Sequence, residues 1–297
     1  MCLISKIILY LILIFIGWVL VVGIASFFIY FRPPKFPVTK APSYFGMEFE
    51  RVSFETEDKK ILSGWFIPSS KETNTTILLL HGYLANKGYM LSTAKLLQPE
   101  YNLFLFDFRA HGESQGRFSS IGFYETRDVL GAIDYLKREK KEKAEKLGAL
   151  GFSLGGAVAI MATEKSPEIS AIVADSSYAT FERMIFSTFR LTSFMKKPMT
   201  TLARYFGKIF FKIDAREISP QKVAEKIKIP IFLIHGREDS EISIEDSRMI
   251  FEAASGPKEF WQVEGAEHGE ALYLYSKEYQ EKVLNFFNKY LGNIPQL

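Results

Sequence analysis

The chain has 297 residues, of which 47% are hydrophobic and 24% are charged, so it can bury a large core and is not expected to be disordered. Its formal net charge of +3 is small for this length and the basic residues are spread out, so no nucleic-acid partner is expected. The single cysteine, Cys2, excludes an intrachain disulfide, a cysteine-rich metal site and cysteine-based catalysis.

Residues 7–31, which follow a short flank of residues 1–6, form an apolar run without a charge. About 25 residues at ~1.5 Å rise exceed the ~30 Å hydrocarbon core, which predicts an uncleaved, single-pass transmembrane helix. A cleaved signal peptide is the alternative, because Gly23-Ile24-Ala25 offers a small-x-small site, but the run is longer than a signal core. The flanking charges nearly balance, so the side of the membrane that carries the rest of the chain stays open.

Residues 32–46 are predicted to form an extended spacer, because prolines at 33, 34, 37 and 42 prevent a regular helix. One domain is expected over residues 47–297. It opens with two predicted strands, 47–54 and 61–67, joined by a polar turn. We expect these strands to form the antiparallel edge of the sheet.

Apolar strand patterns then alternate with helical patterns along the chain. Further strands are predicted at 76–80, 101–106, 147–150, 169–174, 229–234 and 258–263, and helices at 123–137, 157–162 and 277–290. Continuous β-branched and aliphatic runs are typical of strands buried on both faces. The alternation therefore predicts an α/β fold with a doubly wound, mostly parallel sheet.

The alternation breaks between about residues 178 and 215. This segment is rich in aromatic and methionine side chains: Phe186, Phe189, Phe194, Met195, Met199, Tyr205, Phe206, Phe210 and Phe211. We predict a small helical cap that covers an apolar acyl pocket. An ordinary amphipathic helix pair packed on the sheet is the alternative.

The sequence Gly151-Phe152-Ser153-Leu154-Gly155 stands between a predicted strand and an alanine-rich predicted helix. A serine hydroxyl is a poor nucleophile at neutral pH, so catalysis needs it held out of the backbone in a tight turn, beside a base. Glycines on both sides let the strand and the helix approach closely. The pattern predicts that Ser153 is a nucleophile, with a Gly-Ser turn without chemistry as the alternative.

Two backbone N–H groups are candidates for stabilising a developing oxyanion. Leu154 N–H lies at the predicted start of the helix, and Tyr83 N–H follows Gly82 in the loop after strand 76–80. The polar loop 107–114, with Asp107, Arg109 and His111, is expected to tie loops together behind the nucleophile.

Several motifs together resemble the α/β-hydrolase superfamily over about residues 48–291. They are His81-Gly82, Asp107-Phe108-Arg109-Ala110-His111-Gly112-Glu113-Ser114, Gly151 to Gly156, His235-Gly236-Arg237-Glu238-Asp239 and Glu267-His268-Gly269. The monoglyceride-lipase and serine-aminopeptidase-like branch, with its membrane-anchored depalmitoylase relatives, is the most similar.

This resemblance implies a catalytic triad of Ser153, Asp239 and His268, in the superfamily's chain order. Asp175, which also ends a predicted strand, is the rival for the acid, and Glu238 adjoins Asp239. Of the four histidines, His81, His111 and His235 are assigned structural roles in glycine-containing loops. No metal or cofactor motif competes, so none is expected.

The leading hypothesis is a membrane-anchored serine hydrolase that cleaves carboxylic esters or thioesters of lipid-like acyl chains. A serine aminopeptidase is the second hypothesis, and it would need an acidic feature near the pocket, for which Glu113 and Glu182 are candidates. A catalytically inactive hydrolase fold that acts as an interaction module is the third.

Overall fold

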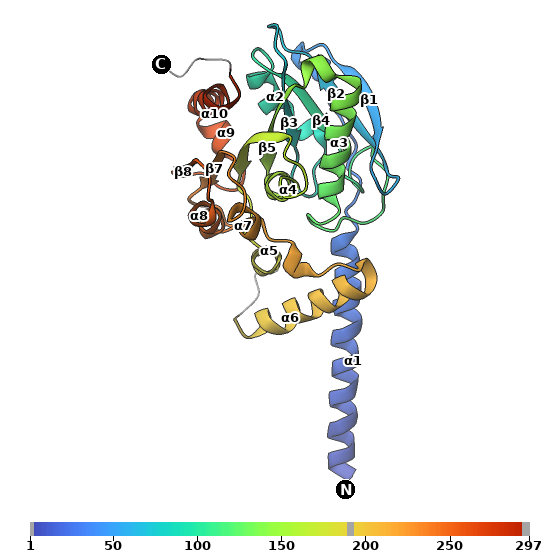
Figure 1. The fold of residues 1–297 in the computed structure, drawn as a ribbon. Helices are drawn as coiled ribbons and strands as arrows, with labels where there is room; N and C mark the ends of the chain where they lie inside the picture. Colours follow the sequence, from blue (N-terminus) through green and yellow to red (C-terminus); the bar gives the residue numbers. More distant parts are fainter. Residues whose placement is uncertain (1–2, 189–192, 293–297) are drawn as a thin grey trace.

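One eight-stranded sheet organises the protein, as a computed structural model of residues 3–188 and 193–292 shows (Figure 1). The strands are β1 (Glu50–Glu55), β2 (Ile61–Ile67), β3 (Thr75–Leu80), β4 (Asn102–Phe106), β5 (Lys146–Phe152), β6 (Ile169–Asp175), β7 (Ile231–Gly236) and β8 (Lys258–Val263). Their order across the sheet is β1-β2-β4-β3-β5-β6-β7-β8.

The pairing confirms the predicted α/β fold with a mostly parallel sheet. β2 pairs antiparallel with β1 and with β4, and the pairs from β4 to β8 are all parallel. The six residues of β3, TTILLL, are all buried, as expected of a central strand covered on both faces. The parallel strands therefore place their carboxyl ends, and the loops that follow them, along one edge of the sheet.

Helices cover both faces of the sheet and divide the core into two apolar clusters. Those on one face include α3 (Glu125–Glu139), α4 (Leu154–Ala162), α7 (Pro220–Ala224) and α8 (Ile244–Ala253). Those on the other are α2 (Leu91–Leu97), α9 (Ala271–Leu274) and α10 (Ser276–Leu291). Only Ser153 separates α4 from the end of β5, and α4 is buried along its whole length, so its position relative to the sheet is fixed.

The segment between β6 and β7 is helical. It contains α5 (Phe181–Thr188), α6 (Ser193–Phe206), a π-helical turn (Gly207–Phe211) and a 3₁₀ turn (Ala215–Glu217). α5 packs on the core through Phe181, Met184 and Ile185, which are at most 4% exposed. Phe189, named above among the apolar side chains, lies outside the described residues.

At the amino-terminal end, α1 (Leu3–Phe31) contains the whole of the predicted segment 7–31 and projects from the domain (Figure 1). Its predicted transmembrane character is not confirmed: across residues 3–188 and 193–292, no helix combines the length and the hydropathy needed to cross a membrane.

The proline-rich residues after α1 lie against the domain. Phe31 itself is 4% exposed, and the Lys35 ammonium donates to the carbonyl oxygen of Ser114. Farther along, the Asn86 amide donates to the carbonyl oxygens of Phe36 and Pro37, each at 3.3 Å. The segment is therefore fastened at several points rather than hanging free.

Candidate active site

Ser153 occupies a strained turn between the last residue of β5 and the first residue of α4. Its backbone angles, φ 52° and ψ −113°, lie in a region that residues other than glycine rarely adopt. Its N–H donates to the carbonyl oxygen of Asp175 at 2.8 Å, which ties the turn to the end of β6. Such a turn lifts the hydroxyl away from the backbone.

The flanking glycines are required by close backbone contacts. A Cβ at Gly151 would lie 2.2 Å from the carbonyl carbon of Gly155, and one at Gly155 would lie 2.1 Å from the carbonyl oxygen of Leu80. These distances leave no room for a side chain, because the contacted atoms are backbone. The turn can form only with glycine at both positions.

Asp239 and His268 meet at the carboxyl ends of β7 and β8, which are neighbours in the sheet. His268 Nδ1 donates to Asp239 Oδ2 at 2.7 Å, and the Phe152 ring packs against the imidazole with centroids 4.9 Å apart. The hydrogen bond places the Nδ1 proton towards the carboxylate, so Nε2 is the nitrogen with a free lone pair. A histidine in this state can act as a general base.

The carboxylate of Asp239 is oriented by four donors. Oδ1 accepts from the N–H groups of Glu241 and Ile242 at 2.9 and 2.8 Å. Oδ2 accepts from His268 Nδ1 and also lies 3.2 Å from His235 Nε2. Burial alone would raise the pKa of Asp239, but the hydrogen bonds from His235 and His268 outweigh it and lower that pKa. Asp239 is therefore ionised at neutral pH.

The same contact acts on His268. Burial lowers the pKa of the imidazole, but the hydrogen bond and the negative charge of Asp239 exceed that effect, so the pKa is raised above its usual value. Glu241 and Asp175 add smaller contributions of the same sign.

His235 is a site residue to which sequence reasoning gave only a structural role. Its Nε2 also donates to the Ile242 carbonyl oxygen at 2.9 Å, and its Nδ1 accepts from the Ser247 hydroxyl at 2.7 Å. The imidazole is completely buried and supports the far side of the Asp239 carboxylate. His235 and Asp239 are four residues apart at the end of β7, and this spacing was the sequence signal from which their contact could have been predicted.

Asp175, the rival acid, is held in a different network. Its Oδ1 accepts from the Ser176 hydroxyl at 2.9 Å, and its Oδ2 accepts from the Tyr279 hydroxyl at 3.2 Å. Burial is the main cause that raises its pKa. The second rival, Glu238, is exposed beside Arg237. The geometry thus pairs His268 with Asp239.

A cavity of about 470 Å³ brings the predicted residues together. Ser153, Leu154, His268 and Tyr83 all line it. The other lining residues are mainly apolar: Leu84, Ala85, Tyr89, Ile121, Phe152, Tyr178, Met184, Ser187, Ser240, Glu241 and Ile242. Among the described residues between β6 and β7, α5 contributes Met184 and Ser187, whereas Phe211 lines a separate cavity.

The loop that carries Tyr83 is braced by His81. Its Nδ1 donates to the Gly82 carbonyl oxygen at 2.7 Å, and its Nε2 accepts from the Phe108 N–H at 3.0 Å. Burial, with the nearby charge of His111, keeps the pKa of His81 well below its usual value, so the ring is neutral. In the described part of the chain, no group of three or more His, Cys, Asp or Glu side chains could hold a metal ion.

Comparison with known proteins places this geometry in a family. A family model for the alpha/beta hydrolase fold matches residues 75–197. The crystallised esterase Pf2001 of Pyrococcus furiosus is similar, with 30% identity, a TM-score of 0.74 and coverage of 88% of this chain and 98% of that one.

Curated relatives are similar at the same level. The protein YqkD of Bacillus subtilis is 29% identical over 73% of this chain and 72% of its own length. The protein bem46 of Schizosaccharomyces pombe is 28% identical over 71% of this chain and 67% of its own. The sheet order, the serine turn and these matches agree, and the chain belongs to the α/β-hydrolase superfamily.

Proposed function

We propose that this hydrolase cleaves carboxylic esters or thioesters through Ser153, His268 and Asp239. The observation that supports the proposal is the 2.7 Å contact between His268 Nδ1 and Asp239 Oδ2, in a protein whose cavity has both Ser153 and His268 in its wall. The similarity to an esterase favours esters as the substrate class.

In the proposed reaction, Ser153 Oγ attacks the carbonyl carbon of the ester while His268 Nε2 takes the hydroxyl proton. The N–H groups of Tyr83 and Leu154 are proposed to stabilise the oxyanion. The tetrahedral intermediate then collapses, and His268 gives its proton to the departing alcohol or thiol. Water, deprotonated by His268, hydrolyses the acyl-enzyme in the second half of the reaction. Asp239 stays ionised and stabilises the imidazolium.

The pH profile tests the role of His268. We expect kcat/KM for a p-nitrophenyl ester to rise with pH through an apparent pKa above 6.5, because Asp239 raises the pKa of His268 and only the neutral imidazole can take the serine proton. Initial rates should be read at the isosbestic wavelength of p-nitrophenol and p-nitrophenolate, since the colour of the product itself depends on pH. An acid limb centred below 6.5 would contradict the proposed base.

The apolar cavity wall predicts a preference for acyl chains longer than acetyl. Each buried methylene contributes ~0.8 kcal/mol, so kcat/KM should rise roughly fourfold per methylene until the cavity is full. An ester series from acetate to palmitate, run on the full-length chain in a neutral detergent, measures this rise. Met184→Trp, which fills part of the cavity from α5, should move the maximum to shorter chains.

A serine aminopeptidase is the second candidate, and Glu241 favours it. Among the residues that line the cavity, Glu241 carries the one carboxylate, and a free substrate amine would need such a charge nearby. Faster cleavage of aminoacyl p-nitroanilides than of acyl esters, abolished by Glu241→Gln, would establish the peptidase. A flat ester series beyond acetate would point the same way.

We also propose that α1 holds the hydrolase at a membrane as an uncleaved, single-pass anchor. Large apolar side chains on this helix are 46–67% exposed: Ile4, Ile7, Ile8, Leu9, Tyr10, Leu11, Ile12, Leu13, Ile14, Trp18 and Val21. Burial of such a surface in lipid is strongly favourable.

Membrane retention is the expected result of a fractionation experiment. The expressed protein should stay in the pellet after carbonate extraction, and its amino-terminal sequence should still contain residues 7–31, because the exposed apolar surface of α1 favours lipid over water. A soluble form that begins near Ser26 would identify the segment as a cleaved signal peptide.

A further inference from the structure

A second cavity, of about 700 Å³, lies where the loop 109–120 meets the end of α1. It is lined by Lys35, Asp58, Lys60, Arg109, Gln115, Gly116, Arg117, Phe118, Ser120, Tyr124 and Phe211, and it shares no lining residue with the cavity at Ser153. Its wall therefore holds four cationic side chains and one carboxylate.

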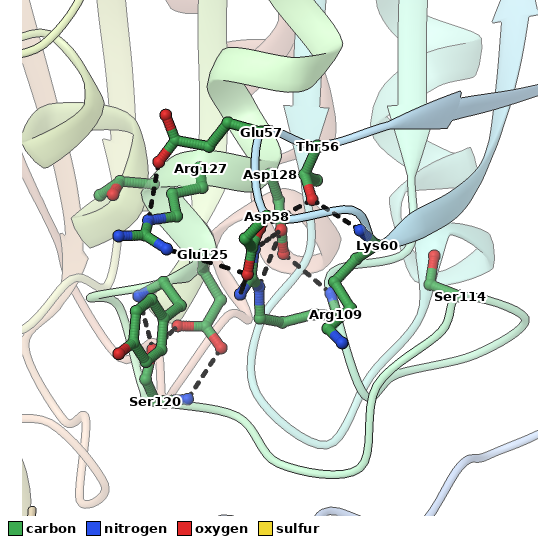
Figure 2. Close-up of polar contacts among 12 residues, drawn as sticks. Thr56, Glu57, Asp58, Lys60, Arg109, Ser114, Ser120, Glu125, Arg127 and Asp128 are labelled. Atoms are coloured by element: carbon green, nitrogen blue, oxygen red, sulfur yellow. Dashed lines mark hydrogen bonds and ion pairs between the residues drawn. The ribbon is translucent and has the colours of Figure 1, made fainter. Parts of the chain in front are cut away.

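The one carboxylate is paired with two cations, Arg109 and, at 3.9 Å, Arg127. Arg109 donates to both oxygens of Asp58, at 2.8 and 2.9 Å, and uses its remaining guanidinium donors on Asp128. Partial burial acts to raise the pKa of Asp58, but the hydrogen bonds from Arg109 lower it to about 2. Figure 2 shows the contacts of Arg109 with Asp58 and Asp128, and Lys60 lines the same cavity as Arg109.

The other three cations have no matching anion. Lys35 donates to the neutral carbonyl oxygen of Ser114, and in the described part of the chain neither Lys35, Lys60 nor Arg117 lies within 4.0 Å of a carboxylate. Lys35 and Arg117 are exposed and Lys60 is half-buried. Positive charges that face one hollow without partners raise the local concentration of anions.

The apolar part of this cavity connects it to α1. Phe118 and Phe211 pack together with ring centroids 5.7 Å apart, and Phe211 also packs on Phe31, the last residue of α1, at 5.5 Å. The loop is fastened to the helix by the Ser119 N–H, which donates to the Phe31 carbonyl oxygen at 2.9 Å. The cavity thus combines cations with an apolar wall at the base of a helix that exposes apolar side chains.

We propose that this cavity binds the phosphate group of an anionic glycerophospholipid, with Lys35, Lys60 and Arg117 around the phosphate and Phe118 and Phe211 against the glycerol and the first acyl carbons. Arg117 can pair with two phosphate oxygens, and the lysines act as point charges. The inference deepens the proposed membrane attachment of α1, because the site lies where that helix joins the domain.

The test titrates soluble short-chain lipids into the full-length chain in a neutral detergent by calorimetry. Dihexanoyl phosphatidylglycerol should bind, and dihexanoyl phosphatidylcholine and inorganic phosphate should bind much more weakly. Lys60→Gln/Arg117→Gln should weaken phosphatidylglycerol binding on the order of thirty-fold, as expected for the loss of two cations beside an anionic headgroup. Lys60→Arg, which keeps the charge, should bind as the unaltered chain does.

Lys277→Gln/Lys282→Gln on α10 is the matched control, since it removes the same charge from one exposed and one half-buried position, neither of which lines the cavity. Equal weakening in this control would show attraction by net charge and overturn the proposal. Phosphate binding as tight as that of the lipid would identify a free-phosphate site, and equal binding of phosphatidylcholine would also overturn it.

Ester hydrolysis measured in parallel separates this proposal from the proposed function. Selective lipid binding without hydrolysis would leave the site standing and overturn only the catalytic role, whereas hydrolysis without lipid binding would do the reverse. Thermal melting of each variant shows that the fold is intact.

Discussion

Ser153→Ala is expected to lower ester hydrolysis by a factor on the order of 10⁶ and to abolish labelling by a fluorophosphonate. The reason is geometric: the turn that carries Ser153 holds its hydroxyl at the cavity, and the other lining serines, Ser187 and Ser240, lie on α5 and in the β7–α8 loop. Turnover of a p-nitrophenyl ester and gel fluorescence after labelling measure the loss.

Two comparisons sharpen this expectation. Ser70→Ala, at an exposed serine outside the cavity, should leave both readouts unchanged. The pair Ser153→Ala/His268→Ala should be no slower than either single variant, because residues that act as a unit are not additive. Labelling that persists without the Ser153 hydroxyl would refute Ser153 as the nucleophile, whereas an unaltered chain that neither reacts with the fluorophosphonate nor hydrolyses esters would favour the inactive interaction module.

Asp239→Asn is expected to reduce turnover by a factor on the order of 10⁴. The N–H groups of Glu241 and Ile242 both point at Oδ1, so an asparagine would place its amide oxygen there and its NH₂ group at the position of Oδ2. That NH₂ would face His268 Nδ1, which must then accept the hydrogen bond and leave its proton on Nε2. The imidazole would hold the wrong tautomer for taking a proton from Ser153.

Asp175→Asn is the matched substitution and should cost far less turnover. Its carboxylate accepts from Ser176 and Tyr279, and an asparagine can keep at least one of these contacts. The two variants should be compared on the same ester, with thermal melting to confirm folding. The opposite ranking would make Asp175 the acid.

The positions of the strands were predictable because their signal is local. Two strands, β2 (61–67) and β8 (258–263), agree with the prediction at both ends, and the other six are present with shifts of at most three residues at one or both ends. β5 extends to Phe152, beyond the predicted Leu150, because Gly151 and Phe152 pair with the last two residues of β6. Such pairing depends on a partner strand that local composition does not reveal.

Four of the described α-helices were missed. α7 and α9 have only five and four residues, too few for a periodic pattern. The two longer ones, α2 and α8, were missed for different reasons. α2 has only seven residues and follows a 3₁₀ turn, so it shows barely two turns of periodicity. α8 carried a readable signal, since the Ser243 hydroxyl caps it and Glu245 and Asp246 stand in its first turn. The apolar pattern of α8 is weak, and this concealed it.

The candidate site was only partly visible in the sequence. The serine turn depends on adjacent residues, so its glycines and Ser153 could be read directly. The meeting of Asp239 with His268 depends instead on β7 and β8 being neighbours in the sheet. The contribution of Met184 to the cavity, and the second contact of His235 with Asp239, arise from tertiary packing that no local pattern encodes.

The residues that follow α1 determine how the hydrolase domain is oriented relative to that helix. A flexible linker of ten residues would have a root-mean-square end-to-end distance of about 17–19 Å and would allow the domain to rotate freely about the end of the helix. Phe31 is instead part of the core, and the Asn86 amide holds the chain at Phe36 and Pro37. The domain therefore has little rotational freedom relative to α1. The mouth of the Ser153 cavity accordingly keeps a fixed position and orientation relative to the axis of that helix.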